Sequence, residues 1–289
     1  MSGFEATRGS DGRLFLRHGP IDLIVEVFGQ QDEVELAYSQ ANDYCADVLE
    51  QLVKELPLLR RPIGAAYPMF QGTIAQAMAR AAWPHRGNFI TPMAAVAGAV
   101  ADAVLNAATQ GRRLERGYVN NGGDIALHLS PGAVLDAGVV ADLQRGGLSG
   151  KVHLCHDMAI RGIATSGWRG RSHSRGIADA VTVLAATAAQ ADVAATMIAN
   201  RVDIDYPGIE RVPANSLDHD SDLGDLAVTV AVAELPEGAR RAALLSGLDL
   251  ARGLLARGVL EGAMLSLGDQ VATVGVLADD ALENKGFQL

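Results

Sequence analysis

Short hydrophobic runs punctuated by glycines occupy the middle of the chain, and this block constrains the fold more than any other feature of the sequence. The runs lie between residues 117 and 164, and helical patterns precede them at residues 32–56 and 92–109. Consecutive strand-like runs predict a meander of β structure. Because helices and strands occur in blocks rather than in strict alternation, this order favours an α+β fold over a doubly wound α/β fold.

The flanking segments continue this mixture of helices and strands. A His-Gly-Pro turn separates residues 14–17 from residues 21–28, so these two runs predict a hairpin. The first helix is expected to end at Pro57, and residues 1–12 to form a disordered tail before a single domain over residues 13–289. We expect further helices at 73–83, 188–201 and 237–257, strands at 179–186, 226–234, 259–267 and 271–276, and an irregular acidic loop at 203–225.

Composition and charge narrow the functional classes. The 289 residues are 49% hydrophobic, which excludes intrinsic disorder, and the net charge of −10 argues against a surface for nucleic acids or anionic membranes. A phosphate-bearing ligand therefore needs local cationic groups. Only two cysteines and a polar N-terminal segment predict a reducing, cytoplasmic compartment. The apolar stretch at residues 92–108 contains Asp102 and Asn106, and its length falls short of a membrane-spanning helix.

The first candidate binding motif is a double-glycine segment made of Asn121, Gly122, Gly123 and Asp124. Paired glycines between two strands permit positive φ angles and let a ligand approach the bare backbone. This arrangement predicts a contact with a cofactor. The alternative is an ordinary turn of a β meander that contacts no ligand.

The second candidate motif is a locally basic loop in this acidic chain. Arg169, Arg171 and Arg175 lie within seven residues, between glycines and beside His173. Guanidinium groups pair with phosphate oxygens, and the preceding residues add hydroxyl and amide donors, namely Thr165, Ser166 and Gly167. His173 is a candidate general base because imidazole titrates near neutral pH. The alternative is a solvated loop whose arginines pair with surface carboxylates.

The third candidate motif lies in an alanine-rich helical pattern. Asp192 and Thr196 are four residues apart, so a helix places their oxygens on one face. A carboxylate and a hydroxyl are hard oxygen ligands of the kind that Mg²⁺ accepts, together with phosphate oxygens and waters. The alternative is that Asp192 only stabilises the nearby helix N-terminus.

These three motifs, in this order, resemble the ApbE-like superfamily, which includes FAD:protein FMN transferases. The family pattern has a Gly-Gly-Asp-Ile strand, an Ala-Thr-Ser-Gly segment, a segment containing a histidine, a strand, and an Ala-Asp-x-x-x-Thr helix. The corresponding residues here are 122–125, 164–167, 173, 181–185 and 191–196. The resemblance extends over nearly the whole chain and is closest to a cytoplasmic side branch of the family that has no lipoprotein signal.

The resemblance implies tandem T-fold-like units, each an antiparallel sheet packed against helices, intertwined within one domain. It also implies FAD or FMN and Mg²⁺ as ligands, and a protein as the acceptor. Asp192 and Thr196 would hold the metal, an acceptor hydroxyl would attack the phosphorus on the FMN side, and AMP would leave. His173 would accept the proton, while the three loop arginines would offset the phosphate charge.

The chain departs from the transferase pattern at two places. Ala97 occupies the position of a family lysine, and residues 173–179 lack the proline and the Thr-Gly turn of the family. A magnesium-dependent FMN transferase is therefore one hypothesis among three. The others are a non-catalytic flavin- or pterin-binding module, and another small-molecule enzyme of cofactor biosynthesis on the same scaffold.

Overall fold

The computed structural model describes residues 3–139 and 150–278, and the chain divides into two compact units. Each unit is assembled from separate stretches of sequence. Unit 1 contains residues 1–135, 153–164 and 185–193, whereas unit 2 contains residues 136–152, 165–184 and 194–289. Strand β8 (Gly162–Ser166) and helix α5 (Ala188–Arg201) contribute residues to both units.

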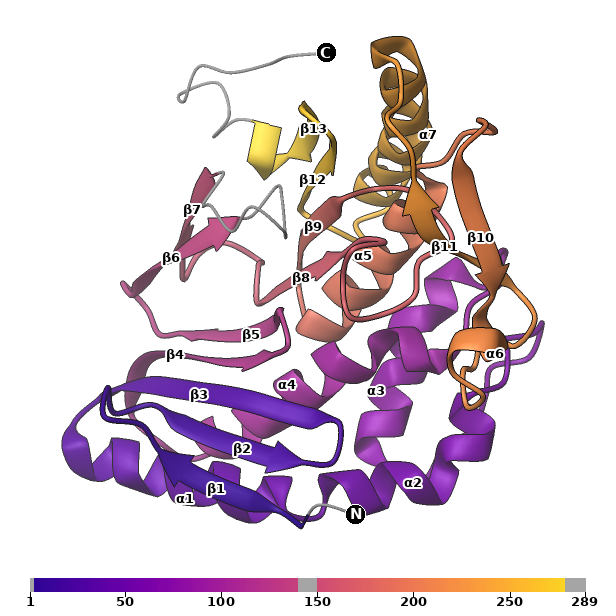
Figure 1. The fold of residues 1–289 in the computed structure, drawn as a ribbon. Coiled ribbons are helices and arrows are strands. Elements are labelled where there is room, and N and C mark those ends of the chain that lie inside the picture. The colour runs from indigo at the N-terminus through magenta and orange to yellow at the C-terminus, as the bar shows by residue number, and fades with distance from the viewer. Residues whose placement is uncertain (1–2, 140–149, 279–289) are drawn as a thin grey trace. The chain divides into compact units, whose positions relative to one another are not determined.

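An antiparallel sheet forms the centre of unit 1 (Figure 1). Its strands lie in the order β1 (Glu5–Arg8), β2 (Leu14–His18), β3 (Ile21–Gly29), β4 (Leu114–Asn121) and β5 (Asp124–Leu129), and the first residues of β8 pair with β5. The predicted hairpin is confirmed, since β2 and β3 pair directly. Every second side chain of β3 is buried because successive strand residues point to opposite faces. One face of the sheet therefore supplies core residues.

Strand β1 corrects the expectation of a disordered tail. It pairs antiparallel with β2, with Glu5 opposite Arg17 and Arg8 opposite Leu14. The Arg8 side chain also forms an ion pair of 3.1 Å with Glu35 and lies over the ring of Tyr38. All four β1 residues are exposed, so hydrophobic patterning carried no strand signal. Backbone pairing and polar contacts hold this segment instead.

The helices of unit 1 pack against the sheet and against each other. Helix α1 (Gln31–Cys45) contacts β3 and α4 (Val96–Thr109), which in turn contacts β4 and β5. The single helix expected at residues 32–56 is instead two helices, because a turn at residues 46–47 separates α1 from α2 (Val48–Leu59). Pro57 does not end α2 but lies in its last turn, where its missing N–H removes one helical hydrogen bond, to the carbonyl of Val53.

The rest of the helical layer contains α3 (Thr73–Ala82) and two short 3₁₀ segments, η1 (Trp83–His85) and η2 (Pro92–Ala95). By length and composition alone, the stretch Pro92–Thr109 is apolar enough to cross a membrane. Half of this stretch is buried inside the structure, and α4 packs on the sheet of unit 1. These contacts are those of a core helix.

Within unit 2, β12 (Gly262–Leu267) pairs antiparallel with both β9 (Ala180–Ala185) and β13 (Gln270–Gly275). Helix α7 (Glu237–Ala256) packs on β12 and β13. The segment expected as an irregular acidic loop contains β10 (Ile209–Pro213), which pairs with β11 (Ala227–Val232), and the short helix α6 (Ala214–Leu217). Strands β6 (Val134–Val139) and β7 (Gly150–Cys155) form a further pair. Antiparallel sheets packed against helices confirm the α+β prediction.

Helices α4 and α5 each place a carboxylate at the N-terminal end of the other, and we call this reciprocal capping the carboxylate exchange. Both oxygens of Asp102 in α4 accept hydrogen bonds of 3.0 Å from the backbone N–H groups of Ala188 and Ala189, at the start of α5. In return, Asp192 of α5 accepts a hydrogen bond of 3.0 Å from the backbone N–H of Gly98, in the first turn of α4. Carboxylates satisfy N–H groups that have no partner within their own helix and interact favourably with the helix dipole. The exchange thus fixes one helix start against the other.

Gly98 is required by this close approach. A Cβ at this position would lie 2.3 Å from the carbonyl oxygen of Ala188. We expect Gly98→Ala to lower the free energy of unfolding by about 1–3 kcal/mol, since neither backbone can move without losing the exchanged hydrogen bonds. The matched control is Gly253→Ala in α7, where a Cβ would meet nothing within 4 Å and should stabilise by about 0.5–1 kcal/mol. Urea denaturation measures both, and equal effects would contradict this packing.

Asp102 should make stability depend on pH. Burial raises the pKa of its carboxyl from 3.8 to about 6, against the opposing effect of the two amide hydrogen bonds. The native state therefore holds this proton more tightly than the unfolded chain, so stability is lost as pH rises from about 4 to 6. Across that window, the free energy of unfolding of the wild type should fall relative to that of Asp102→Asn by at most about 3 kcal/mol. Urea denaturation at each pH measures this difference. A difference that stays constant with pH would contradict the assignment, and Asp249→Asn on α7 serves as an exposed control.

Candidate functional site

The double-glycine turn has the backbone that its sequence predicts. Gly122 and Gly123 connect β4 to β5 with φ angles of 65° and 117°, a region that favours glycine. The Asn120 side-chain oxygen accepts a hydrogen bond of 2.8 Å from the Gly123 N–H. The buried Asn121 amide donates to the carbonyl oxygen of Ala97, at 3.1 Å. The turn is therefore anchored to the start of α4.

Near that helix start the charges of Asp124 and Asp102 act on Asp192, and we call these three carboxylates the carboxylate junction. The pKa of Asp192 is raised well above its usual value, first by burial, then by the negative charge of Asp124 and more weakly by Asp102. Backbone hydrogen bonds from Gly98 and Ala97 oppose this shift. Asp124 and Asp192 come from two different predicted motifs, and the fold brings their charges together.

The junction offers oxygen donors of the right chemistry for a magnesium ion. Within residues 3–139 and 150–278, no group of three or more His, Cys, Asp or Glu side chains is arranged to hold a metal. Mg²⁺ commonly uses only one or two carboxylates and takes its other ligands from waters and phosphates. The repulsion between Asp124 and Asp192 is the kind that a bound cation relieves. The donor set therefore fits a phosphate-bound magnesium ion.

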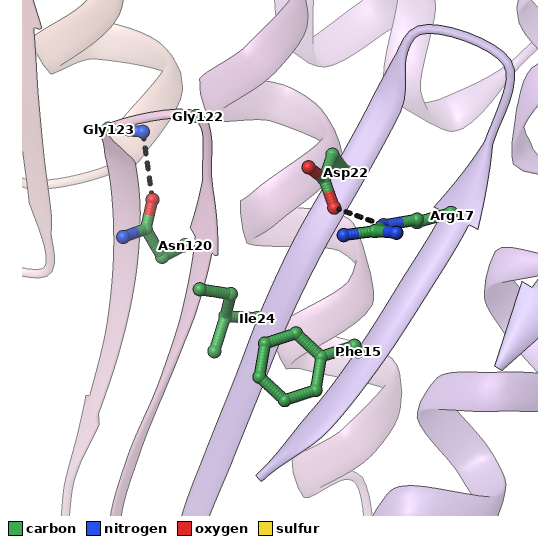
Figure 2. Close-up of a pocket in the computed structure, with 7 residues that line it drawn as sticks. All are labelled: Phe15, Arg17, Asp22, Ile24, Asn120, Gly122 and Gly123. Atoms are coloured by element: carbon green, nitrogen blue, oxygen red, sulfur yellow. Dashed lines mark hydrogen bonds and ion pairs between the residues drawn. The ribbon is translucent and has the colours of Figure 1, made fainter. Parts of the chain in front are cut away.

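A small hollow lies beside the glycine turn in unit 1. Figure 2 shows Phe15 and Ile24 on its apolar side, and Asp22 paired with Arg17 at 3.1 Å on its polar side. Gly122, Gly123 and Asn120 complete the lining, and the volume is about 210 Å³. Asn120 and Asn121 are consecutive strand residues, so Asn120 faces this hollow while Asn121 faces α4. The turn is thus accessible beside an open sheet face.

Unit 2 holds the Thr165, Ser166 and Gly167 segment at the end of β8. The hydroxyl groups of Thr165 and Thr182 are 2.9 Å apart, so Thr165 already has a hydrogen-bond partner. A Cβ at Gly167 would lie 2.4 Å from the carbonyl oxygen of Asp179. The glycine therefore permits a close backbone approach between two chain segments of unit 2.

The arginines of the basic loop have different surroundings. Arg169 pairs with Asp179 at 2.7 Å and lies over the ring of Trp168, so this guanidinium group already has a carboxylate partner, although Asp179 is largely buried and not a surface carboxylate. Arg171 and His173 are exposed. Arg175 is fixed through its backbone, because its N–H donates to the side-chain oxygen of Asn200 at 2.8 Å. Arg171, His173 and Arg175 thus remain the candidates for a ligand contact.

Asn200 belongs to a polar stripe on α5. Asp192, Thr196 and Asn200 follow at intervals of four residues and are all partly buried, so they share one face of the helix. Thr196 and Asn200 lie within unit 2, where Asn200 holds the basic loop at the C-terminal part of α5. The predicted placement of Asp192 and Thr196 on one helix face agrees with this stripe, and their metal-binding role stays a prediction.

Sequence reasoning missed three residues that organise the site. Asn200 carried a signal, since it continues the spacing of Asp192 and Thr196. Asp102 carried a weaker one, as an acidic residue in an otherwise apolar stretch. Asp179 carried none, because its pairing with Arg169 and with the Gly268 N–H at 2.6 Å depends on a distant turn.

The comparisons with known proteins cover different shares of the chain. The family model described as AbpE bacteria matches residues 5–273. A UPF0280 protein of Methanopyrus kandleri is 35% identical over 159 residues, which is 54% of this chain and 61% of that protein. Another UPF0280 protein, from Methanosphaerula palustris, is 36% identical over 56% of this chain and 65% of that protein. The chain thus matches less than two thirds of each relative's length.

Two solved structures are similar at low sequence identity. The apo flavinyl transferase ApbE of Pseudomonas stutzeri is 14% identical, with a TM-score of 0.49 over 98% of both chains. The ApbE protein of Thermotoga maritima is also 14% identical, with a TM-score of 0.43 over 81% of this chain and 97% of that protein. Because both TM-scores are below 0.5, the assignment rests on the family model, which covers more than half of the chain. The predicted resemblance is confirmed, and the chain belongs to the AbpE family of bacteria.

Proposed function

We propose that this protein binds FAD or a related flavin nucleotide together with Mg²⁺ and transfers FMN to a hydroxyl group of a protein acceptor. The observation that carries the proposal is the buried Asp192 carboxyl, whose pKa is raised first by burial and then by the negative charge of Asp124. Perturbed carboxyl groups beside a ligand-accessible turn are characteristic of functional sites. Membership of the AbpE family supports a flavin ligand, which the resemblance of its motifs to the FMN transferases implies.

In this proposal, Asp192 and Asp124 hold the metal, and Thr196 adds its hydroxyl oxygen from the next turn of α5. Bound Mg²⁺ supplies charge neutralisation for the pyrophosphate and for the departing AMP. Asp102 acts indirectly, because it fixes the start of α5 and thereby the position of Asp192. Gly122 and Gly123 admit the ligand to the bare backbone of the turn between β4 and β5.

The basic loop completes the proposed chemistry. Arg171 and Arg175 offset phosphate charge, and His173 takes the proton of the acceptor hydroxyl while that oxygen attacks the phosphorus on the FMN side. The oxygen–phosphorus bond to AMP breaks as the new phosphoester bond forms.

Free thiols at Cys45 and Cys155 support a reducing compartment such as the cytoplasm.

A second candidate is a flavin- or pterin-binding module without transfer activity. Two observations favour it. Ala97, in place of the family lysine, uses its carbonyl group to hold Asn121 and supplies no cation. The guanidinium group of Arg169 is already paired with Asp179. Without the family lysine, and with Arg169 paired, two positive charges are withdrawn from the phosphate. Their withdrawal would lower the rate of phosphoryl transfer without removing the pocket.

Release of AMP separates these two candidates. Protein incubated with FAD, Mg²⁺ and a hydroxyl-bearing protein acceptor should release AMP, measured by chromatography. Asp192→Asn should lower the rate about 10- to 100-fold because the metal loses a charged ligand, while the amide oxygen can still accept from Gly98. Asp249→Asn on α7 is the matched control. Flavin binding without AMP in every acceptor tested would favour the module.

Metal binding should also depend on pH. Because the pKa of Asp192 is raised, protons compete with Mg²⁺ and the apparent affinity should fall as pH is lowered. Bound Mg²⁺ should raise the melting temperature at pH 8 more than at pH 5, measured by calorimetry. Asp192→Asn should remove this shift. An equal rise in wild type and variant would contradict metal binding at Asp192, whatever the transfer activity.

A further inference from the structure

The region between Glu55 and Asp102 has a charge opposite to that of the chain. It contains Arg60, Arg61, Arg80 and Arg86 and no acidic residue, although the net charge of the chain is −10. The carboxylate of Glu55 is itself occupied, since it accepts hydrogen bonds of 2.8 and 2.7 Å from the N–H groups of Gln71 and Gly72 at the start of α3. The sequence between Glu55 and Asp102 therefore carries only positive formal charges.

Aromatic side chains gather at the end of α3 within this cationic region. The Arg86 guanidinium lies 4.4 Å from the centre of the Trp83 ring, and the Tyr67 ring meets Trp83 edge-on at 5.1 Å. Arg80 precedes Trp83 by three residues and thus lies on the same side of the helix. We call Tyr67, Arg80, Trp83 and Arg86 the arginine–aromatic patch.

The patch is accessible and its charges are available. Tyr67 is 41% exposed, and the nearby Met69 is 80% exposed. Among the residues that the structure describes, neither Arg80 nor Arg86 forms an ion pair with a carboxylate, whereas Arg8 and Arg211 do. Tyr, Trp, Met and Arg are the residue types enriched at the centres of protein interfaces. The patch has the composition of a binding surface.

We propose that the arginine–aromatic patch binds an acidic segment of a partner protein that also presents an apolar side chain. Arg80 and Arg86 pair with its carboxylates, and Trp83, Tyr67 and Met69 contact the apolar group. A polypeptide fits better than a nucleic acid because the overall charge of −10 opposes a continuous polyanion. This inference does not depend on flavin binding or on the carboxylate junction.

Fluorescence of Trp83 tests the proposal in the full chain. The protein contains two tryptophans, so Trp168→Phe leaves Trp83 as the only reporter. The probe is a synthetic peptide of glutamates around one leucine, and its control replaces each glutamate by glutamine. We expect only the acidic peptide to change the Trp83 emission at low salt, and the affinity to fall about tenfold at ~0.3 M salt.

Charge-reversed variants locate the interaction. Arg80→Glu with Arg86→Glu should weaken peptide binding at least about tenfold, whereas Arg241→Glu with Arg252→Glu on α7 makes the same charge change elsewhere and should leave binding intact. Circular dichroism verifies that both variants fold. Equal binding by the two variants, equal binding of the glutamine peptide, or no response to either peptide would overturn the proposal. Tighter, patch-dependent binding of single-stranded oligothymidylate would assign the patch to nucleic acid instead.

Discussion

The exchange of carboxylates between α4 and α5 is the interaction on which the rest of the candidate site depends. Asp102 binds the first amides of α5, and Asp192 binds an amide in the first turn of α4. Each helix start is rich in unpaired N–H groups and carries a partial positive charge. Two acidic side chains can therefore be held in a buried setting without cationic partners. Burial still disfavours the charged form of both carboxyl groups, and their pKa values are therefore raised.

This arrangement attaches the glycine turn and the alanine-rich helix to the same helix start. Asn121 binds the carbonyl oxygen of Ala97, so the turn and Asp192 attach to the same helix start. Asp124 then approaches Asp192 closely enough for their charges to interact. Further along α5, Asn200 holds the backbone of Arg175. Asp192, Thr196 and Asn200 thus lie on one face of this helix.

Local patterns predicted most of the elements correctly and failed where tertiary contacts compete with them. The hairpin of β2 and β3, the meander from β4 onward, and helices α5 and α7 follow from periodicity and turn residues. Strand β1 is exposed along its whole length, and β10 lies in a polar, acidic segment. Neither has a hydrophobic pattern, since both are held by pairing with β2 and β11. The break at residues 46–47 likewise has no proline or glycine to announce it.

The sequence by itself determined the residue types and local geometry of the site. Two adjacent glycines impose a turn with positive φ, spacing by four places Asp192 and Thr196 on one helix face, and the order of the motifs identifies the family. Only the tertiary structure decided how these groups are used. It brought Asp124 to Asp192, gave Asp102 to the start of α5, and paired Arg169 with Asp179. The physical reason is that charge interactions and hydrogen bonds depend on distance in space, which spacing along the chain fixes only within a helix or a turn.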